Sequence, residues 1–260
     1  MIIDTHVHAY PDWLAAKALQ KLKNDELTPL YDATINGLIN QMDKCGVGKS
    51  ILLNIATNVH QMHSVNDFAA SINNPRIIPF GSVYPTAPDV LDELDRIKSL
   101  GMQGVKFHPE YQNFFVDADF MRPIYKKISS LGLVTVFHAG YDVAFKPPYH
   151  CTPERAVKVL SMMDSPVIFA PWGGLNFPEE VLQYLAGTDA YIDLSMGYNY
   201  ISLDMAQKII DKHSKDRLLF ASDGPWHSPE KEKVFLNNLR ISKDDLEKIY
   251  HKNVEKLIKI

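Results

Sequence analysis

The feature that most constrains the fold is an alternation of short apolar runs with longer segments of helical periodicity. Most of the apolar runs are nearly continuous and rich in β-branched residues, as is typical of parallel strands covered by helices. Eight such runs predict eight strands, at Ile2–His8, Ser50–Ala56, Ile77–Tyr84, Gly104–His108, Val134–His138, Val167–Ala170, Ala190–Ser195 and Leu218–Ser222.

The segments between the runs have the spacing of amphipathic helices. Two examples are Ala87–Leu100 and Leu203–His213, and Pro153 and Pro229 stand where a first helical turn accepts proline. Eight strand and helix units in 260 residues average about 32 residues each, the spacing of a (β/α)₈ TIM barrel. We therefore predict one α/β barrel domain over residues 1–260, with closing helices after Ser242.

An open doubly wound sheet is the structural alternative. That fold normally carries a glycine-rich phosphate loop after its first strand, and the stretch DTHVHAYP has none. The barrel is therefore preferred.

Charge and cysteine content exclude several classes of partner. The 27 basic and 31 acidic residues give a net charge of −4 and are interspersed, so we expect neither a nucleic acid nor a membrane partner. Two cysteines form no disulfide framework, and the N-terminus lacks the pattern of a signal peptide. We expect a cytoplasmic protein that acts on a small molecule, and self-association into a homo-oligomer stays open.

Four of the eight predicted strands end in a residue type that binds metals or protons. In a barrel the reactive residues come from the C-terminal ends of different strands. His6 and His8 end the first strand and, two residues apart, face the same side. The fourth strand ends in His108. His138 ends the fifth strand and Asp223 follows the eighth, which closes against the first, so His138 and Asp223 are the residues expected to join His6 and His8.

Three imidazoles and a carboxylate predict one divalent cation, Zn²⁺ as the first expectation, with Mn²⁺, Fe²⁺ or Ni²⁺ as alternatives. Ten histidines in 260 residues give about 0.4 chance pairs of this spacing, so the pair alone is a weak signal. Its position at a strand end, in register with the other ligands, favours a metal site over core histidines or helix caps.

The segments IIDTHVH, GVKFHPEYQ, VFHAG and ASDGPW, with the WGG turn after the sixth strand, resemble the amidohydrolase superfamily. The similarity is to its amidohydrolase-related branch of metal-dependent barrel hydrolases and decarboxylases, and it extends to the closing helix with Asn253. It implies that His6, His8 and His138 are metal ligands. Asp223 would be a ligand and also the base that takes a proton from the attacking water.

One position departs from that family. Pro171 stands where the family typically has a histidine, two residues before paired glycines. The absence of that histidine argues against a second metal, even though Lys106 stands near the place of a bridging carbamylated lysine. The same absence argues against ordinary hydrolysis. His108, His150 and His227 are the candidates to replace the missing imidazole.

Other residues near the strand ends could contact the substrate. Lys106 could bind a substrate carboxylate or phosphate, or form a structural ion pair. Trp172 and Trp226 could wall an apolar substrate or serve as packing anchors, and the proline-rich stretch Tyr141–Cys151 could form a lid.

The pair His60 and His63 lacks the neighbouring glutamate of the helical zinc motif, so we expect no metal there.

We therefore predict a metal-dependent hydrolase of an amide, ester or lactone. The first alternative is a decarboxylase of a small aromatic acid on the same metal scaffold. A second alternative, motivated by Pro171, is a metal-binding or ligand-binding member that has lost catalysis. A barrel nuclease is disfavoured because the sequence has no basic stripe for a polyanion.

Overall fold

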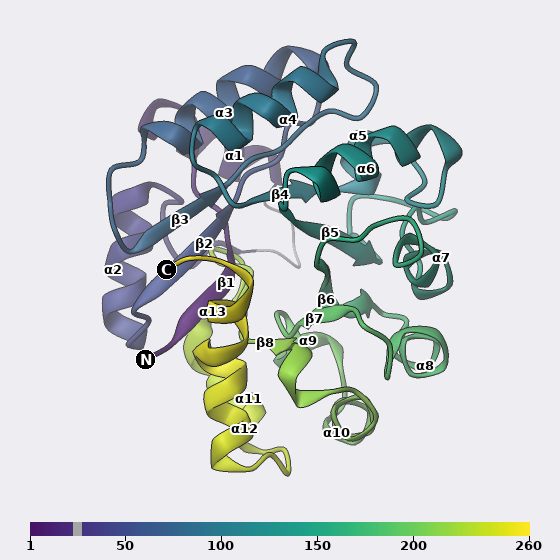
Figure 1. Cartoon of the computed structure of the whole chain (residues 1–260). Coiled ribbons are helices and arrows are strands. Elements are labelled where there is room, and N and C mark those ends of the chain that lie inside the picture. Colours follow the sequence, from purple (N-terminus) through teal and green to yellow (C-terminus); the bar gives the residue numbers. More distant parts are fainter. Residues whose placement is uncertain (23–27) are drawn as a thin grey trace.

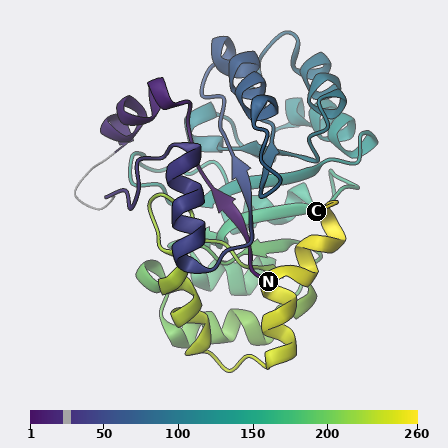
Figure 2. The same ribbon diagram turned by 90° about the vertical axis from the view of Figure 1, so that its left-hand side faces the viewer.

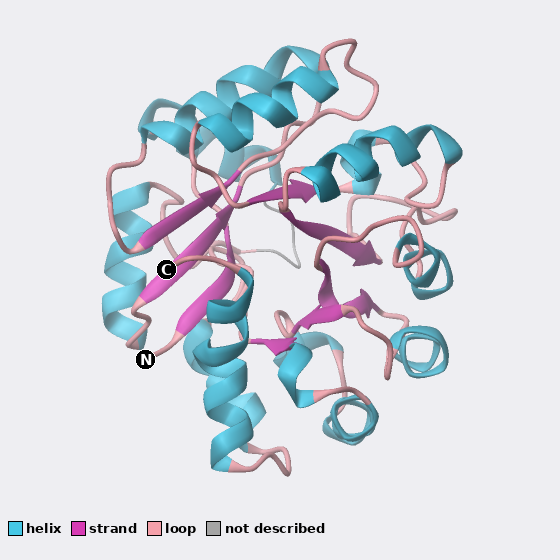
Figure 3. Cartoon of the chain, in the orientation of Figure 1, coloured by secondary structure: helices cyan, strands magenta, loops and turns pink. Residues whose placement is uncertain are grey.

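The computed structural model describes residues 1–22 and 28–260. Its strands form the centre of the molecule and its helices surround them (Figures 1 and 3). All eight predicted strands are present, as β1 (Ile3–Val7), β2 (Lys49–Leu53), β3 (Ile77–Phe80), β4 (Gly104–Phe107), β5 (Val134–Gly140), β6 (Val167–Leu175), β7 (Tyr191–Asp193) and β8 (Leu218–Leu219). Compared with prediction, β6 extends five residues further and β8 is reduced to two residues.

Every strand pair is parallel, in the order β1-β2-β3 for one sheet and β4-β5-β6-β7-β8 for the other. The regular ladder is interrupted at two seams, each of which has an isolated parallel bridge, Gly81 with Val105 and Val7 with Gly224. At the second seam the amide of His8 donates to the carbonyl of Gly224 at 2.6 Å. The strand order is that of the predicted TIM barrel, with β8 beside β1.

The helices follow the strands along the chain and occupy the outside of the barrel (Figure 3). α1 lies on the side toward which β1 points (Figure 2). None of the helices in the described ranges is both long and apolar enough to cross a bilayer. The helices are α1 (Asp12–Leu22), α2 (Ile35–Cys45), α3 (Met62–Ser71), α4 (Val90–Ser99), α5 (Pro109–Gln112), α6 (Arg122–Ser130), α7 (Pro153–Val159), α8 (Pro178–Glu180), α9 (Gly197–Tyr200), α10 (Leu203–Lys212), α11 (Pro229–Asn237), α12 (Lys243–Glu247) and α13 (Asn253–Leu257).

Short irregular turns complete several of these helices. Single 3₁₀ turns are η1 (Val59–Gln61), η2 (Asp119–Met121) and η4 (Lys215–Arg217), and π-helical turns are η3 (Val181–Leu185) and η5 (Lys248–Lys252). The predicted closing segment therefore consists of α12, η5 and α13 in succession.

The closing helix covers the end of the barrel at which the strands begin. Val254 and Ile258 pack on the inner apolar cluster built from the strands, which includes Ile3 and Leu219. Asn253 is fully buried, and its side-chain amide donates to the carbonyl of Leu218 at 2.9 Å. Because this end is closed by apolar packing, the opposite end, where the strands finish, is left for the polar residues of the site.

Candidate metal centre

The two histidines of the first strand are held through one ring nitrogen each. His6 Nδ1 lies 2.8 Å from Oδ2 of Asp193, at the end of β7, and His8 Nδ1 lies 2.7 Å from the carbonyl oxygen of Leu53. A carbonyl or an ionised carboxylate only accepts hydrogen bonds, so both Nδ1 atoms carry the proton. In the neutral rings Nε2 therefore presents a lone pair.

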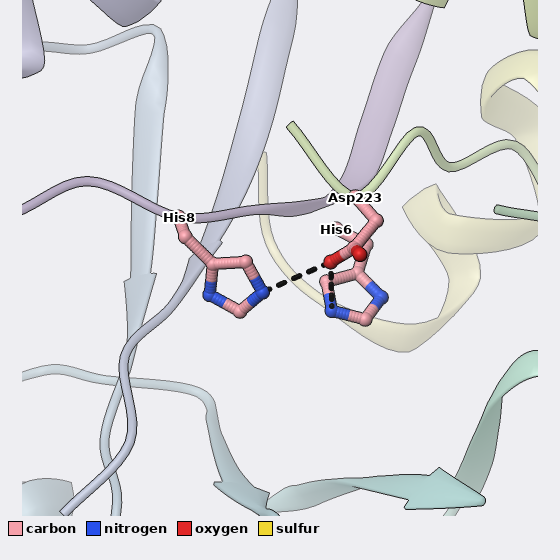
Figure 4. Close-up of side chains that lie close together, drawn as sticks. All are labelled: His6, His8 and Asp223. Carbon is pink, nitrogen blue, oxygen red and sulfur yellow. Dashed lines mark hydrogen bonds and ion pairs between the residues drawn. The ribbon is translucent and has the colours of Figure 1, made fainter. Parts of the chain in front are cut away.

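Both lone pairs point at the same carboxylate. Oδ1 of Asp223 is 3.2 Å from Nε2 of His6 and 3.0 Å from Nε2 of His8 (Figure 4). When both rings are neutral, three acceptor atoms converge with no proton between them, an arrangement that a cation would stabilise. The donor set of two imidazoles and one carboxylate fits a divalent metal, and these three residues lie close enough to share one ion.

Asp223 reaches this position through an unusual backbone. Its φ is +69°, a left-handed conformation that costs a non-glycine residue energy and often marks a functional site. Its amide donates to the carbonyl of His6 at 2.8 Å, which fixes it beside β1. Burial opposes ionisation of Asp223, but the charge of His6 and the charge and hydrogen bond of His8, when those rings are protonated, hold its pKa below the usual value.

Asp4 ties the same two strands together beneath the ligands. Its carboxylate accepts from the amide of His6 and from the amide and hydroxyl of Ser222, the last at 2.6 Å. Burial raises the pKa of Asp4 to about 7, although those hydrogen bonds favour the charged form. Asp4 thus aligns β1 with the segment that leads into Asp223.

Lys106 enters the site from β4. Its side chain is almost fully buried, and Nζ lies 3.4 Å from Nε2 of His6. Burial lowers the pKa of Lys106 to about 8, and burial followed by the nearby Lys106 charge lowers the pKa of His6 well below its usual range. His6 is therefore neutral at neutral pH.

The structure places His138 in a second cluster, with His108 and Asp142. The imidazoles of His108 and His138 stack at 4.1 Å, and Nε2 of His138 donates to the carbonyl of Tyr141 at 3.0 Å. Nδ1 of His108 accepts from the amide of Tyr111, so its Nε2 carries the proton and faces Asp142 at 3.3 Å. These bonds attach the start of the loop after β5 to the strand ends.

The pKa shifts of His108, His138 and Asp142 agree with that arrangement. Burial lowers the pKa values of His108 and His138, so both rings are neutral. Burial opposes ionisation of Asp142, yet the adjoining His108 and His138 lower its pKa to about 2. His138 is thus poised near the first group without joining it, because its Nε2 is bonded to the backbone.

The other two candidate imidazoles have different surroundings. His150 pairs with Glu110, Nδ1 to Oε2 at 2.6 Å, and its ring packs on Phe115. His227 is buried between the rings of Tyr198 and Tyr200, and its Nδ1 has no hydrogen-bond partner among the described residues.

The two tryptophans near the strand ends differ in burial. Trp172 is buried edge-on against Phe235, as a packing anchor would be, whereas Trp226 is half-buried.

Both ring nitrogens of His63 face acidic side chains, Asp89 at 2.8 Å and Glu93 at 2.7 Å. His63 is therefore part of an ion-pair network with Asp89 and Glu93.

Sequence reasoning missed Asp193 and Asp4, the two carboxylates that orient the ligands. The available signal for Asp193 was a further apolar strand that ends in an acid, in the stretch YIDLS. An aspartate at that point contacts His6 only because the fold brings the end of β7 within hydrogen-bonding distance of β1, which the sequence does not state.

The family model for amidohydrolases matches residues 3–260. The chain belongs to the amidohydrolase family. Members of this family are metal-dependent hydrolases and decarboxylases, so the protein is an enzyme. No protein of curated function matches its sequence.

Solved structures share the fold at low sequence identity. 5-Carboxyvanillate decarboxylase from Sphingomonas paucimobilis superposes with a TM-score of 0.74 at 15% identity, over 100% of this chain and 99% of that one. A probable 2-pyrone-4,6-dicarboxylic acid hydrolase from Acinetobacter baumannii gives 0.70 at 18%, over 98% of both chains. A dihydroxybenzoic acid decarboxylase from a Polaromonas species, with bound manganese, gives 0.72 at 17%, over 98% and 96%.

Proposed function

We propose that this amidohydrolase is a metal-dependent hydrolase of a small amide, ester or lactone. The observation that carries the proposal is the convergence of two imidazole lone pairs and the Asp223 carboxylate on one point. Both rings are fixed in that tautomer by acceptors that cannot move, the carboxylate of Asp193 and the carbonyl of Leu53.

His6, His8 and Asp223 would hold one divalent cation, with His138, from β5 on the opposite wall of the barrel, as the proposed fourth ligand. Imidazole and carboxylate donors suit Zn²⁺, and Mn²⁺ is the ion bound in the Polaromonas decarboxylase. When bound, such an ion lowers the pKa of a water and polarises a substrate carbonyl.

The chain's own contribution to the reaction centres on Asp223. The low pKa of its carboxylate keeps it ionised at neutral pH, so it can accept the proton of an attacking water. The carboxylate can then return that proton to the leaving group. Its left-handed backbone and its bond to His6 keep it from rotating away.

Decarboxylation of a small aromatic acid is the second candidate. It is favoured by the similarity to two decarboxylase structures across nearly the whole chain. Release of CO₂ from benzoate derivatives, measured beside hydrolysis of nitrophenyl esters, separates the two reactions.

We place the enzyme in the cytoplasm, with small molecules rather than nucleic acid as partners. Both cysteines, Cys45 and Cys151, are free and buried, as expected in a reducing compartment.

The test is metal content by elemental analysis, on protein purified without chelators or a polyhistidine tag. We expect one equivalent of zinc or another divalent metal, lost in the His6→Ala/His8→Ala variant and retained in the matched His60→Ala/His63→Ala variant. Hydrolysis of a chromogenic ester should disappear on chelation. Two equivalents would refute the inference from Pro171, and none after reconstitution would favour a non-catalytic binding protein.

A further inference from the structure

Lys106 is a buried cation without an ion-pair partner. Only 1% of the residue is exposed, and no carboxylate among the described residues lies within 4.0 Å of its ammonium. Burying an uncompensated charge is costly, and lysine is almost never fully buried unless it is paired. The site is therefore electrostatically incomplete as the chain builds it.

The neighbours of Lys106 do not supply the missing negative charge. The contact to its Nζ is the neutral ring of His6, and the charge of the lysine also acts on the neutral rings of His108 and His138. The two carboxylates that attract it from further away are Asp193 and Asp223, in that order.

Both of those carboxylates already have partners. Asp193 accepts from His6 and from the amide of Ser195, and Asp223 faces His6 and His8. A cation bound by His6, His8 and Asp223 would add more positive charge next to Lys106. The balance of charge at the strand ends then favours an anionic ligand.

We propose that Lys106 receives a carboxylate group of the ligand, so that this enzyme acts on small carboxylic acids or on amides, esters or lactones that carry one. The proposal rests on the proposed function for its site. Because Asp193 and Asp223 already act on this ammonium, a carboxylate with one negative charge meets less repulsion there than a phosphate dianion does.

The position of Lys106 determines how such a ligand lies. Nζ is 3.4 Å from Nε2 of His6, and that same nitrogen is 3.2 Å from Oδ1 of Asp223. A carboxylate on Lys106 therefore sits beside the candidate metal ligands. Lys106 would hold the substrate with its reacting group close to Asp223, and it would discriminate acids from their neutral analogues.

The test compares acids with neutral molecules of the same shape. Binding of acetate and acetamide, and of benzoate and benzamide, is measured by calorimetry on zinc-loaded and on chelator-stripped protein. The variants are Lys106→Met, Lys106→Gln in case the first does not fold, and the exposed Lys126→Met as the matched control. Zinc content is measured on each.

We expect the parent and the Lys126→Met protein to prefer an acid over its amide by about tenfold or more, the scale of a charge-assisted hydrogen bond. The Lys106 variants should lose that preference and keep their zinc. The Lys106-dependent preference should persist in stripped protein. A parent that binds no zinc but shows this preference would refute the proposed function and support the carboxylate site.

Four outcomes overturn the proposal. Lys106 variants could bind acids as the parent does, or none of the four molecules could bind the parent. Inorganic phosphate could displace benzoate at lower concentration than acetate does, which would indicate a phosphate site. Finally, the Lys106 variants could lose zinc while the mass of the parent increases in the presence of bicarbonate. That result would indicate that Lys106 is a carbamylated metal ligand.

Discussion

Replacement of Asp193 by asparagine should weaken metal binding without touching a metal ligand. Oδ2 of Asp193 accepts from Nδ1 of His6 at 2.8 Å, and both groups are almost fully buried. Asparagine preserves the size of the side chain and removes its charge, so His6 loses the group that fixes its tautomer and raises its basicity. Loss of such an outer partner typically weakens metal affinity by about 10-fold to 100-fold, or about 1.4–2.7 kcal/mol.

The assay is a zinc titration in competition with a chromogenic chelator. Because ligand binding to the folded state raises its stability, the increase in Tm on adding zinc should shrink in parallel. Asp189→Asn is the matched control, since Asp189 lies just before β7, is highly exposed and pairs only with Arg217 on the surface. We expect its zinc affinity to equal that of the parent.

Equal zinc affinities for Asp193→Asn and the parent would refute the tautomer argument. Asp193 also accepts from the amide of Ser195 at 2.8 Å, so the variant could lose stability for a reason unrelated to zinc. Unfolding of both proteins in zinc-free buffer measures that separate cost. Only the part of the change that depends on zinc bears on His6.

Three further predictions concern stability. Burial lowers the pKa of His213 from 6.5 to about 4. The free energy of unfolding, measured with urea, should therefore decrease as the pH is lowered from 6.5 to 4, by about 3 kcal/mol more than in a His213→Gln variant. Gly140→Ala should lower Tm much more than Gly101→Ala: both glycines have positive φ, but only a Cβ at Gly140 would meet backbone, 2.3 Å from N of Leu175. Asn253→Ala should cost about 1–3 kcal/mol by denaturant titration, because it leaves the buried carbonyl of Leu218 unpaired.

The strands, and the placement of His6 and His8 on one side of the first strand, were predictable because both depend on local chain properties. Continuous apolar runs such as Val134–His138 indicate buried parallel strands wherever they fold, and His6 and His8 share a face by the geometry of one strand. The backbone of Asp223 was not predictable, since its left-handed conformation is stabilised by contacts with β1.

The sequence does not determine which partner a side chain contacts. The sequence predicts His138 as a metal ligand together with His6 and His8, and in the structure it donates to Tyr141 and stacks on His108. That choice depends on the path of the loop after β5, which is a tertiary property. The same holds for Lys106, which has no carboxylate partner within residues 1–22 and 28–260, a feature that becomes visible only once all eight strand ends are assembled.

The sequence by itself determined the alternation of strands and helices, the barrel and the identity of the residues at its mouth. Hydrophobic periodicity and strand geometry depend on residues a few positions apart, so the sequence alone reveals them. Only the tertiary structure decided that Asp193 accepts a hydrogen bond from Nδ1 of His6 and that Asp223 meets Nε2 of the same ring. Those contacts join residues about 190 to 220 positions apart, and the barrel arrangement of the strands brings them together.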